Sequence, residues 1–311
     1  MHTYSYADCL STSLKVNWRV EDVLRDDTFD PARPWLPAAL SAVDGITCLT
    51  ERESMLLTQV EMVSYAHLFG YVEEFVAPQV VQLAAEQEDG DRVAFEALTN
   101  FAAEEEKHMR LFRAVRERCD AVLGFEAELI DGADATARYV LSRNRGAVLL
   151  LTAAIEWFTQ LHFVEAFKGD AAIDPLTKRI FRAHWLEEAQ HAKLDHLETL
   201  RAFDGMDEAE RESAIDHLIE LVGALDGLLQ AQSDLDVVNF ERHAGRALSS
   251  AHRAEVRREI LLAKRWTFLE SGVTHPRFLE LFRAVTTGAQ RDRVDVALAP
   301  LVGGRRLAMA V

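Results

Sequence analysis

Apolar side chains recur at every third or fourth position along most of the chain, and this spacing predicts long amphipathic helices. The first long helix is expected to begin at Thr50, which forms a capping box with Glu53. It should run to about Glu88, with a kink at Pro78. After a short turn, a second helix is expected over about 92–122, so the two helices should form an antiparallel hairpin.

A second hairpin is expected further along the chain. The segment at about 146–167 has apolar residues nearly all round, so it should be the most buried helix. Asp174 and Pro175 then suit the N-cap and first position of a helix that runs to about Phe203. The long connection at about 123–145 links the hairpins, and a helical bundle with one long crossover has this arrangement.

Shorter helices are expected on either side of these hairpins. One should lie between Leu14 and Leu24, before the proline-containing break at 30–34. Gly272 is expected to cap the end of a later helix. Helices are expected after the second hairpin over about 207–233, 249–271 and 276–285.

Composition supports a helical protein. Glycine (15) and proline (7) are scarce for 311 residues, and no segment alternates apolar and polar residues as a strand does. The length suits one large domain. We expect a single domain over 1–311, with a bundle core at about 50–204 and accessory helices at about 205–311.

The charge balance excludes some partners. The chain has 51 acidic and 34 basic side chains, a formal net charge of −17, whereas nucleic acids and anionic membrane surfaces require a basic footprint. The most apolar stretch, Ala147 to Phe158, is only about 12 residues long and contains Glu156, which is too short and too polar for a membrane span. We therefore expect neither a nucleic-acid partner nor a membrane partner.

The cysteines indicate a reducing compartment. Cys9, Cys48 and Cys119 are far apart and show no Cys-x-x-Cys spacing. The N-terminal stretch up to Trp18 lacks the basic and apolar regions of a signal peptide. A soluble, cytoplasmic protein is the expectation.

Each predicted hairpin carries one Glu-x-x-His motif, Glu105 to His108 and Glu188 to His191. Positions i and i+3 share a helix face, so each pair can direct both side chains to one point. About one such pair should arise by chance in a chain this rich in glutamate, so a single motif would be weak evidence. The repeat in both hairpins makes the pattern informative.

Two upstream glutamates complete the repeat. Glu73 precedes Glu105 by 32 positions, and Glu156 precedes Glu188 by 32 positions. Residues equidistant from the turn of an antiparallel hairpin face each other, so these side chains should meet at one level. Glu156 lies in an apolar helix, where an unpaired carboxylate is very costly. Two divalent ions would balance four such carboxylates.

Neighbouring residues leave some alternatives open. Glu74 competes with Glu73, although the hairpin symmetry favours Glu73. Glu104 is expected on a solvated acidic face. Glu165 competes with Glu156, but it lies too near the turn of the second hairpin to face Glu188. Structural roles are expected for His67, His162 and His196.

The combined pattern is the signature of ferritin-like dinuclear carboxylate proteins. The narrower pattern His184-x-x-x-Glu188-x-x-His191 resembles the p-aminobenzoate N-oxygenase family of diiron oxygenases, over roughly residues 55–200. The resemblance implies an all-α, ferritin-like four-helix bundle with additional N- and C-terminal helices. It also implies that His184 is an additional ligand. With the glutamates and histidines of the repeat, of which Glu73 is assigned by hairpin symmetry alone, this gives the predicted metal ligands, with no further catalytic or cofactor-binding residue: Glu73, Glu105, His108, Glu156, His184, Glu188 and His191.

The resemblance implies that two iron ions activate dioxygen and oxidise a small organic substrate, by N-oxygenation of an amine or by hydroxylation. The same ligand types also suit manganese. An external electron donor is required, and a homodimer is compatible with this type of bundle. The main alternative is a ferritin-like ferroxidase or iron-handling protein without an organic substrate. A manganese catalase or a radical-generating subunit ranks lower, because the sequence singles out none of Tyr65, Tyr71 and Tyr139. A metal-free scaffold is the remaining alternative.

Overall fold

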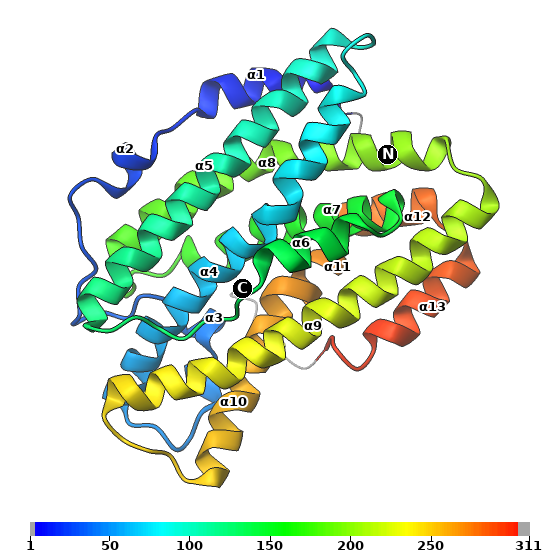
Figure 1. Cartoon of the computed structure of the whole chain (residues 1–311). Helices are drawn as coiled ribbons and strands as arrows, with labels where there is room; N and C mark the ends of the chain where they lie inside the picture. Colours follow the sequence, from blue (N-terminus) through cyan, green and yellow to red (C-terminus); the bar gives the residue numbers. More distant parts are fainter. Residues whose placement is uncertain (1–3, 304–311) are drawn as a thin grey trace.

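The computed structural model describes residues 4–303, and all regular secondary structure in this range is helical (Figure 1). Two antiparallel hairpins pack together, and the connection between them contains the short helix α6 (Ala133–Leu141). This arrangement confirms the all-α, ferritin-like bundle that the motifs implied. The bundle helices are α4 (Glu51–Ala85), α5 (Arg92–Leu123), α7 (Arg145–His162) and α8 (Pro175–Asp204).

Local sequence signals determine where these helices begin. Thr50 accepts a hydrogen bond from the Glu53 backbone amide, and the Glu53 side chain accepts one from Thr50, which completes the predicted capping box. Asp174 caps α8 by accepting from the Leu176 amide, with Pro175 as the first helical residue. Pro78 lies inside α4 without ending it.

Helix α7 is the most buried element, as predicted from its composition. Every residue from Gly146 to Thr159 is buried. The helix continues through a π-helical turn, η2 (Phe163–Phe167), so it ends where it was predicted to end. By length and composition, residues 145–167 could cross a membrane, but 83% of the most apolar window is buried inside the protein. This burial is typical of a core helix.

The N-terminal segment differs from the prediction of one helix between Leu14 and Leu24. It forms α1 (Tyr6–Val16) and α2 (Val20–Leu24), with a break at 17–19. Ser5 caps α1 at an earlier position than expected, and the non-helical backbone of Asn17 ends it. Both helices lie across the outside of α5 and α8 (Figure 1). The short helices α3 (Ala38–Ser41) and η1 (Val43–Gly45) lead into the bundle.

The C-terminal third packs mainly against α7. Its first helix is longer than predicted, because the actual cap is Gly245 with φ 64°, and its last helix was not predicted. The elements are α9 (Glu208–Ala244), α10 (Ser250–Arg265), the π-helical turn η3 (Trp266–Glu270), α11 (Ser271–Val273), α12 (Pro276–Val285) and α13 (Gly288–Leu298).

Gly272 does not cap a helix as predicted. It lies inside α11, where the helix passes very close to α7. A Cβ atom at this position would lie 2.2 Å from the carbonyl oxygen of Ala154. The glycine is therefore required by helix packing rather than by a turn.

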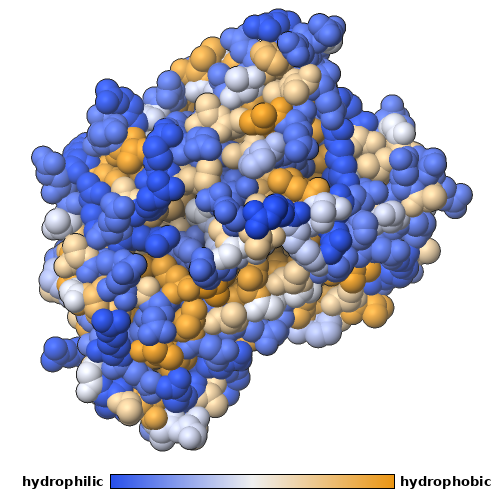
Figure 2. Space-filling view, in the orientation of Figure 1, coloured by the Kyte–Doolittle hydropathy of each residue, from blue (hydrophilic) through white to orange (hydrophobic). Residues whose placement is uncertain are grey.

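One continuous hydrophobic cluster extends from Cys9 to Leu298 and includes residues of all four bundle helices and of the C-terminal helices. The single-domain organisation stays a prediction, and the ends of its range, 1–3 and 304–311, lie outside the described residues. On the face shown in Figure 2, hydrophobic surface gathers in a band where α6 approaches α9. Most of the remaining surface on this face is hydrophilic.

Candidate metal centre

The two Glu-x-x-His motifs meet in the middle of the bundle. Glu105 and His108 come from α5, and Glu188 and His191 come from α8. One ligand atom from each of these four residues lies within 4.8 Å of the others, and all four side chains are buried. The i, i+3 spacing therefore brings the side chains together as predicted.

Two carboxylates lie between the histidines. Glu188 places Oε2 2.5 Å from Nδ1 of His191 and Oε1 3.2 Å from Nδ1 of His108. Glu105 places Oε1 2.8 Å from Nδ1 of His191 and Oε2 3.4 Å from Nδ1 of His108. Each carboxylate thus offers one oxygen to each side of the cluster, so Glu105 and Glu188 would help to hold an ion on either side.

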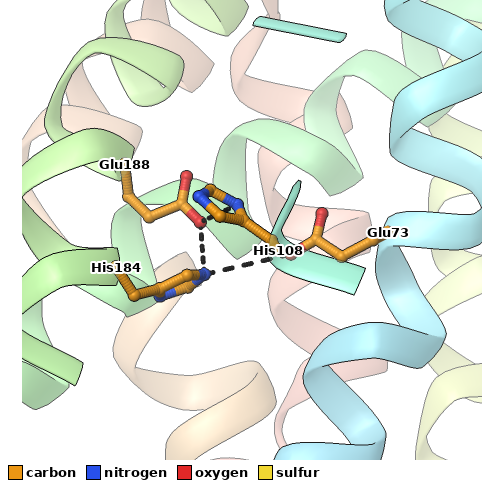
Figure 3. A group of neighbouring side chains, drawn as sticks. All are labelled: Glu73, His108, His184 and Glu188. Atoms are coloured by element: carbon orange, nitrogen blue, oxygen red, sulfur yellow. Dashed lines mark ion pairs between the residues drawn. The ribbon is translucent and has the colours of Figure 1, made fainter. Parts of the chain in front are cut away.

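His184 joins the side of the cluster that contains His108 (Figure 3). Its Nε2 lies 2.5 Å from Oε1 of Glu188 and 4.0 Å from Oε1 of Glu73. The side chain of Glu73, from α4, points into this group and is buried. Glu74 instead lines a pocket on the outside of the bundle.

Glu156 lies on α7 and is 2% exposed. It is outside the two groups whose ligand atoms lie within 4.8 Å of one another, and its Oε2 has no hydrogen-bond partner. It is nevertheless close enough to Glu188, Glu105 and His191 to share their electrostatic field. The structure therefore brings six predicted ligands into tight groups and places the seventh beside them.

Glu104 is not solvated, which corrects the sequence-based expectation. It is 7% exposed and accepts a hydrogen bond from Nε2 of His191 at 2.8 Å. Glu187, the equivalent residue of the second hairpin, accepts one from Nε2 of His108 at 2.9 Å. The repeated sequence Glu-Glu-x-x-His was the signal that could have identified both residues.

These contacts set the tautomers of the two histidines. Because Nε2 of each ring donates to a carboxylate, Nδ1 is the ring nitrogen that faces the central glutamates and is left to hold an ion. Lys107 pairs with Glu187 at 2.6 Å, and Gln190 donates to Glu104 at 2.7 Å. The two hairpins thus exchange supporting carboxylates.

Burial and mutual repulsion govern protonation in the cluster. Burial, followed by the nearby Glu188 and Glu105, raises the pKa of Glu156 well above its ordinary value. Burial and Glu105 do the same to the pKa of Glu73. Burial would also raise the pKa of Glu188, but the surrounding histidines, beginning with His184, hold it well below its ordinary value.

The histidine pKa values respond in the opposite sense. Burial would lower the pKa of His108 and of His191, but Glu188 and Glu105 outweigh it and raise both pKa values well above the ordinary range. In the metal-free protein, bound protons therefore offset part of the negative charge of the cluster. Bound cations would displace these protons.

The unsatisfied atoms in the cluster fit metal ions. Several buried atoms lie close to oppositely charged groups but make no hydrogen bond of acceptable geometry: both oxygens of Glu105, Nδ1 of His108 and both ring nitrogens of His184. Orphaned buried donors and acceptors are rare in folded proteins. Their convergence with carboxylates and imidazoles, the ligand types of iron and manganese, is what a dinuclear centre requires.

Three other histidines that were considered from the sequence take no part in the cluster. His162 accepts at Nδ1 or donates to the hydroxyl of Tyr65, at 2.7 Å. His67 lines the pocket between α4 and α5, and His196 lies on the opposite side of α8, in ring contact with Tyr4. Glu165 is exposed near the end of the second hairpin.

Comparison with known proteins agrees with this geometry. Residues 11–271 match the sequence model of the family described as p-aminobenzoate N-oxygenase AurF. A search among curated proteins finds no significant match.

Similar solved structures include two mutants of an R2-like ligand-binding oxidase with a reconstituted Mn/Fe cofactor. The chain is 15% and 14% identical to them, with TM-scores of 0.47 and 0.45, and each match covers 84% of this chain and 93% of the other. The family match covers most of the chain and includes every residue of the buried cluster. The chain belongs to the p-aminobenzoate N-oxygenase AurF family and is a diiron oxygenase.

Proposed function

We propose that this oxygenase N-oxygenates a small organic amine, with hydroxylation of a C–H bond as the second candidate reaction. The observation that carries the proposal is the buried, two-sided cluster of carboxylates and histidines within the part of the chain that matches the family. When bound, two iron ions would supply the reduction of dioxygen and the oxidation of the substrate.

The chain's own residues would divide the ions between two positions. We assign Glu73, His108 and His184 to one position, and Glu156 and His191 to the other. Glu105 and Glu188 would serve both, because each offers one oxygen to each side. Glu104 and Glu187 would hold the histidine rings in place, and the apolar helices would exclude water.

A polar pocket between α4 and α5 supports a small substrate. It has a volume of about 130 Å³, and its lining includes His67, Arg116 and Phe112. The ring of Phe112 lies 5.0 Å from the ring of His184, so one aromatic side chain separates this pocket from the cluster. Gly70, which has no side chain, keeps the pocket open on the α4 side.

A larger apolar cavity of about 240 Å³ lies on the other side of α7. Its route to the cluster passes through two aromatic layers, since Phe268 contacts Phe69 and Phe69 contacts His184. We therefore assign the substrate approach to the pocket at Phe112.

The direct test is single turnover with isotopically labelled dioxygen. The protein, loaded with two ferrous ions, is mixed with p-aminobenzoate, aniline or an alkylamine under ¹⁸O₂, and the products are analysed by mass spectrometry. We expect labelled hydroxylamine or nitroso products from an amine. Consumption of dioxygen without any labelled organic product, with storage of iron far beyond two ions per chain, would instead support the ferroxidase alternative.

Three further proposals concern the cellular location, the oligomeric state and the electron supply of the protein. We propose a cytoplasmic protein, which the free thiols of Cys9, Cys48 and Cys119 support. We also propose a homodimer, to be tested by sedimentation. The reaction would draw electrons from an external donor.

A further inference from the structure

We propose that Trp18 is the point at which electrons from an external one-electron carrier enter the protein on their way to the metal centre; this proposal rests on the proposed oxygenase function. Trp18 lies in the break between α1 and α2, at the outer surface of α5. Its indole ring stacks on the imidazole of His108, with ring centroids 5.8 Å apart and an interplanar angle of 15°. Trp18 therefore contacts the same imidazole ring that carries the predicted ligand atom, Nδ1.

A second connection links the same two residues. The ammonium group of Lys107 lies over the indole ring, 4.3 Å from its centroid. Lys107 also pairs with Glu187 at 2.6 Å, and Glu187 accepts from His108 at 2.9 Å. Trp18 is thus coupled to His108 by direct stacking and by a continuous chain of polar contacts.

Trp18 differs from the other aromatic residues that touch the centre. Four aromatic side chains other than histidine, among residues 4–303, contact the rings of the three cluster histidines. Three of them, Phe69, Phe101 and Phe112, are fully buried phenylalanines. Only Trp18 is partly exposed, so only Trp18 can be approached by a protein that does not enter the bundle.

The polar group of Trp18 does not explain its position. Its indole Nε1 is buried without a hydrogen-bond partner, as is Nε1 of Trp157 and of Trp185. The ring of Trp18 is instead held over Lys107 and His108 by its π face.

The electron balance is simple. Each transfer removes one electron from the reduced carrier and reduces one ferric ion to the ferrous state. No bond forms or breaks in Trp18, and no proton is exchanged there. Two transfers restore both ferrous ions, which dioxygen can then oxidise again.

The test follows reduction of the metal centre and requires no organic substrate. The full chain, loaded with two iron ions and oxidised, is mixed with a reduced ferredoxin in a stopped-flow instrument, and the loss of ferric absorption is recorded. We expect Trp18→Leu to slow reduction several-fold, and Trp18→Phe, which keeps an aromatic ring, to recover part of the rate. Trp185→Leu is the matched control, because Trp185 is also partly buried but stacks on Phe163 and not on a cluster histidine.

A merely structural role would give the opposite sign, because a loosened N-terminal segment would admit reductants more easily. An unchanged or faster rate in Trp18→Leu, at equal iron content and thermal stability, overturns the proposal. If Trp18→Leu does not retain two irons, Trp18→Phe is compared with the wild type instead. A reduction rate of Trp18→Phe at or above the wild-type rate would contradict the proposal. If no amine is oxidised but Trp18→Leu still slows reduction of the metal centre, only the proposed amine reaction is rejected.

Discussion

Glu104 of the first hairpin accepts a hydrogen bond from Nε2 of His191 of the second hairpin, at 2.8 Å. The carboxylate lies one residue before Glu105, whose own oxygen approaches Nδ1 of the same ring at 2.8 Å. Two consecutive glutamates of α5 therefore hold both nitrogens of one imidazole on α8. This contact joins the hairpins at the level of the metal centre and specifies the orientation of the ring.

Replacing Glu104 by Gln should weaken metal binding without disrupting the fold, because the ring loses its charged acceptor. We expect a loss of about 10–100-fold in affinity, typical of residues that orient a ligand histidine. Glu187→Gln should have a similar effect through His108. Metal titration followed by calorimetry measures both. Glu106→Gln is the control, since Glu106 is exposed and should leave the affinity unchanged.

Replacing Glu188 by Ala should remove both ions. Its two oxygens approach His184 and His191 at 2.5 Å, so neither side of the cluster is complete without it. Metal content by mass spectrometry should fall from two ions per chain to nearly none. The exposed Glu165→Ala variant should retain two ions. Full metal occupancy in Glu188→Ala would show that this residue does not hold the two ions.

Replacing Glu156 by Gln should stabilise the metal-free protein while impairing metal binding. Burial, followed by the nearby Glu188 and Glu105, raises the pKa of this carboxyl well above its ordinary value, so near neutral pH the folded metal-free protein must bind a proton that the unfolded chain releases. The amide is neutral in both states and avoids this cost, and we expect a gain of about 1–3 kcal/mol in the free energy of unfolding. Denaturant unfolding without metal provides the measurement. A destabilised metal-free variant would contradict the assigned electrostatics.

The stabilisation by metal should increase with pH. Glu73, Glu156, His108 and His191 all have raised pKa values, so the folded, metal-free protein retains protons that the unfolded chain releases. Stability from these groups is therefore lost as pH rises above about 4.5 for the glutamates and about 6.5 for the histidines. Metal binding displaces the same protons.

The difference in Tm between the metal-loaded and metal-free protein should accordingly widen from about pH 5.5 to about pH 8. Differential scanning fluorimetry with cobalt, which does not oxidise readily, gives this difference at each pH. The Glu188→Ala variant, which should bind neither ion, serves as the control. A difference in Tm that stays constant or becomes smaller as pH rises would contradict this prediction.

Replacing Gly272 by Ala should destabilise the fold, because the new Cβ would lie 2.2 Å from the Ala154 carbonyl oxygen. The helices α7 and α11 would have to separate, which costs about 1–3 kcal/mol or more. Gly227→Ala is the matched control, since this helical glycine has no atom within 4 Å of the new Cβ. That change should stabilise the protein by about 0.5–1 kcal/mol. Chemical denaturation measures whether each variant is less or more stable than the wild type.

The sequence by itself determined the elements of the bundle and most of the cluster. Capping signals at Thr50 and Asp174 act within one helical turn, so they could be recognised without tertiary information. The 32-residue spacing from Glu73 to Glu105 and from Glu156 to Glu188 predicted a common level, because helical geometry and hairpin symmetry are local and regular. His184 required the family resemblance as well.

Only the tertiary structure decided which residues surround that cluster. Glu104 was expected in solvent, but α1 and α8 cover it, and Ser13 of α1 donates to its carboxylate at 2.7 Å. The stacking of Trp18 on His108 depends on a break between α1 and α2 that no strong local signal marks. Gly272 was interpreted as a cap because its contact, Ala154, is more than a hundred residues away. Contacts between distant segments depend on packing, which local periodicity does not encode.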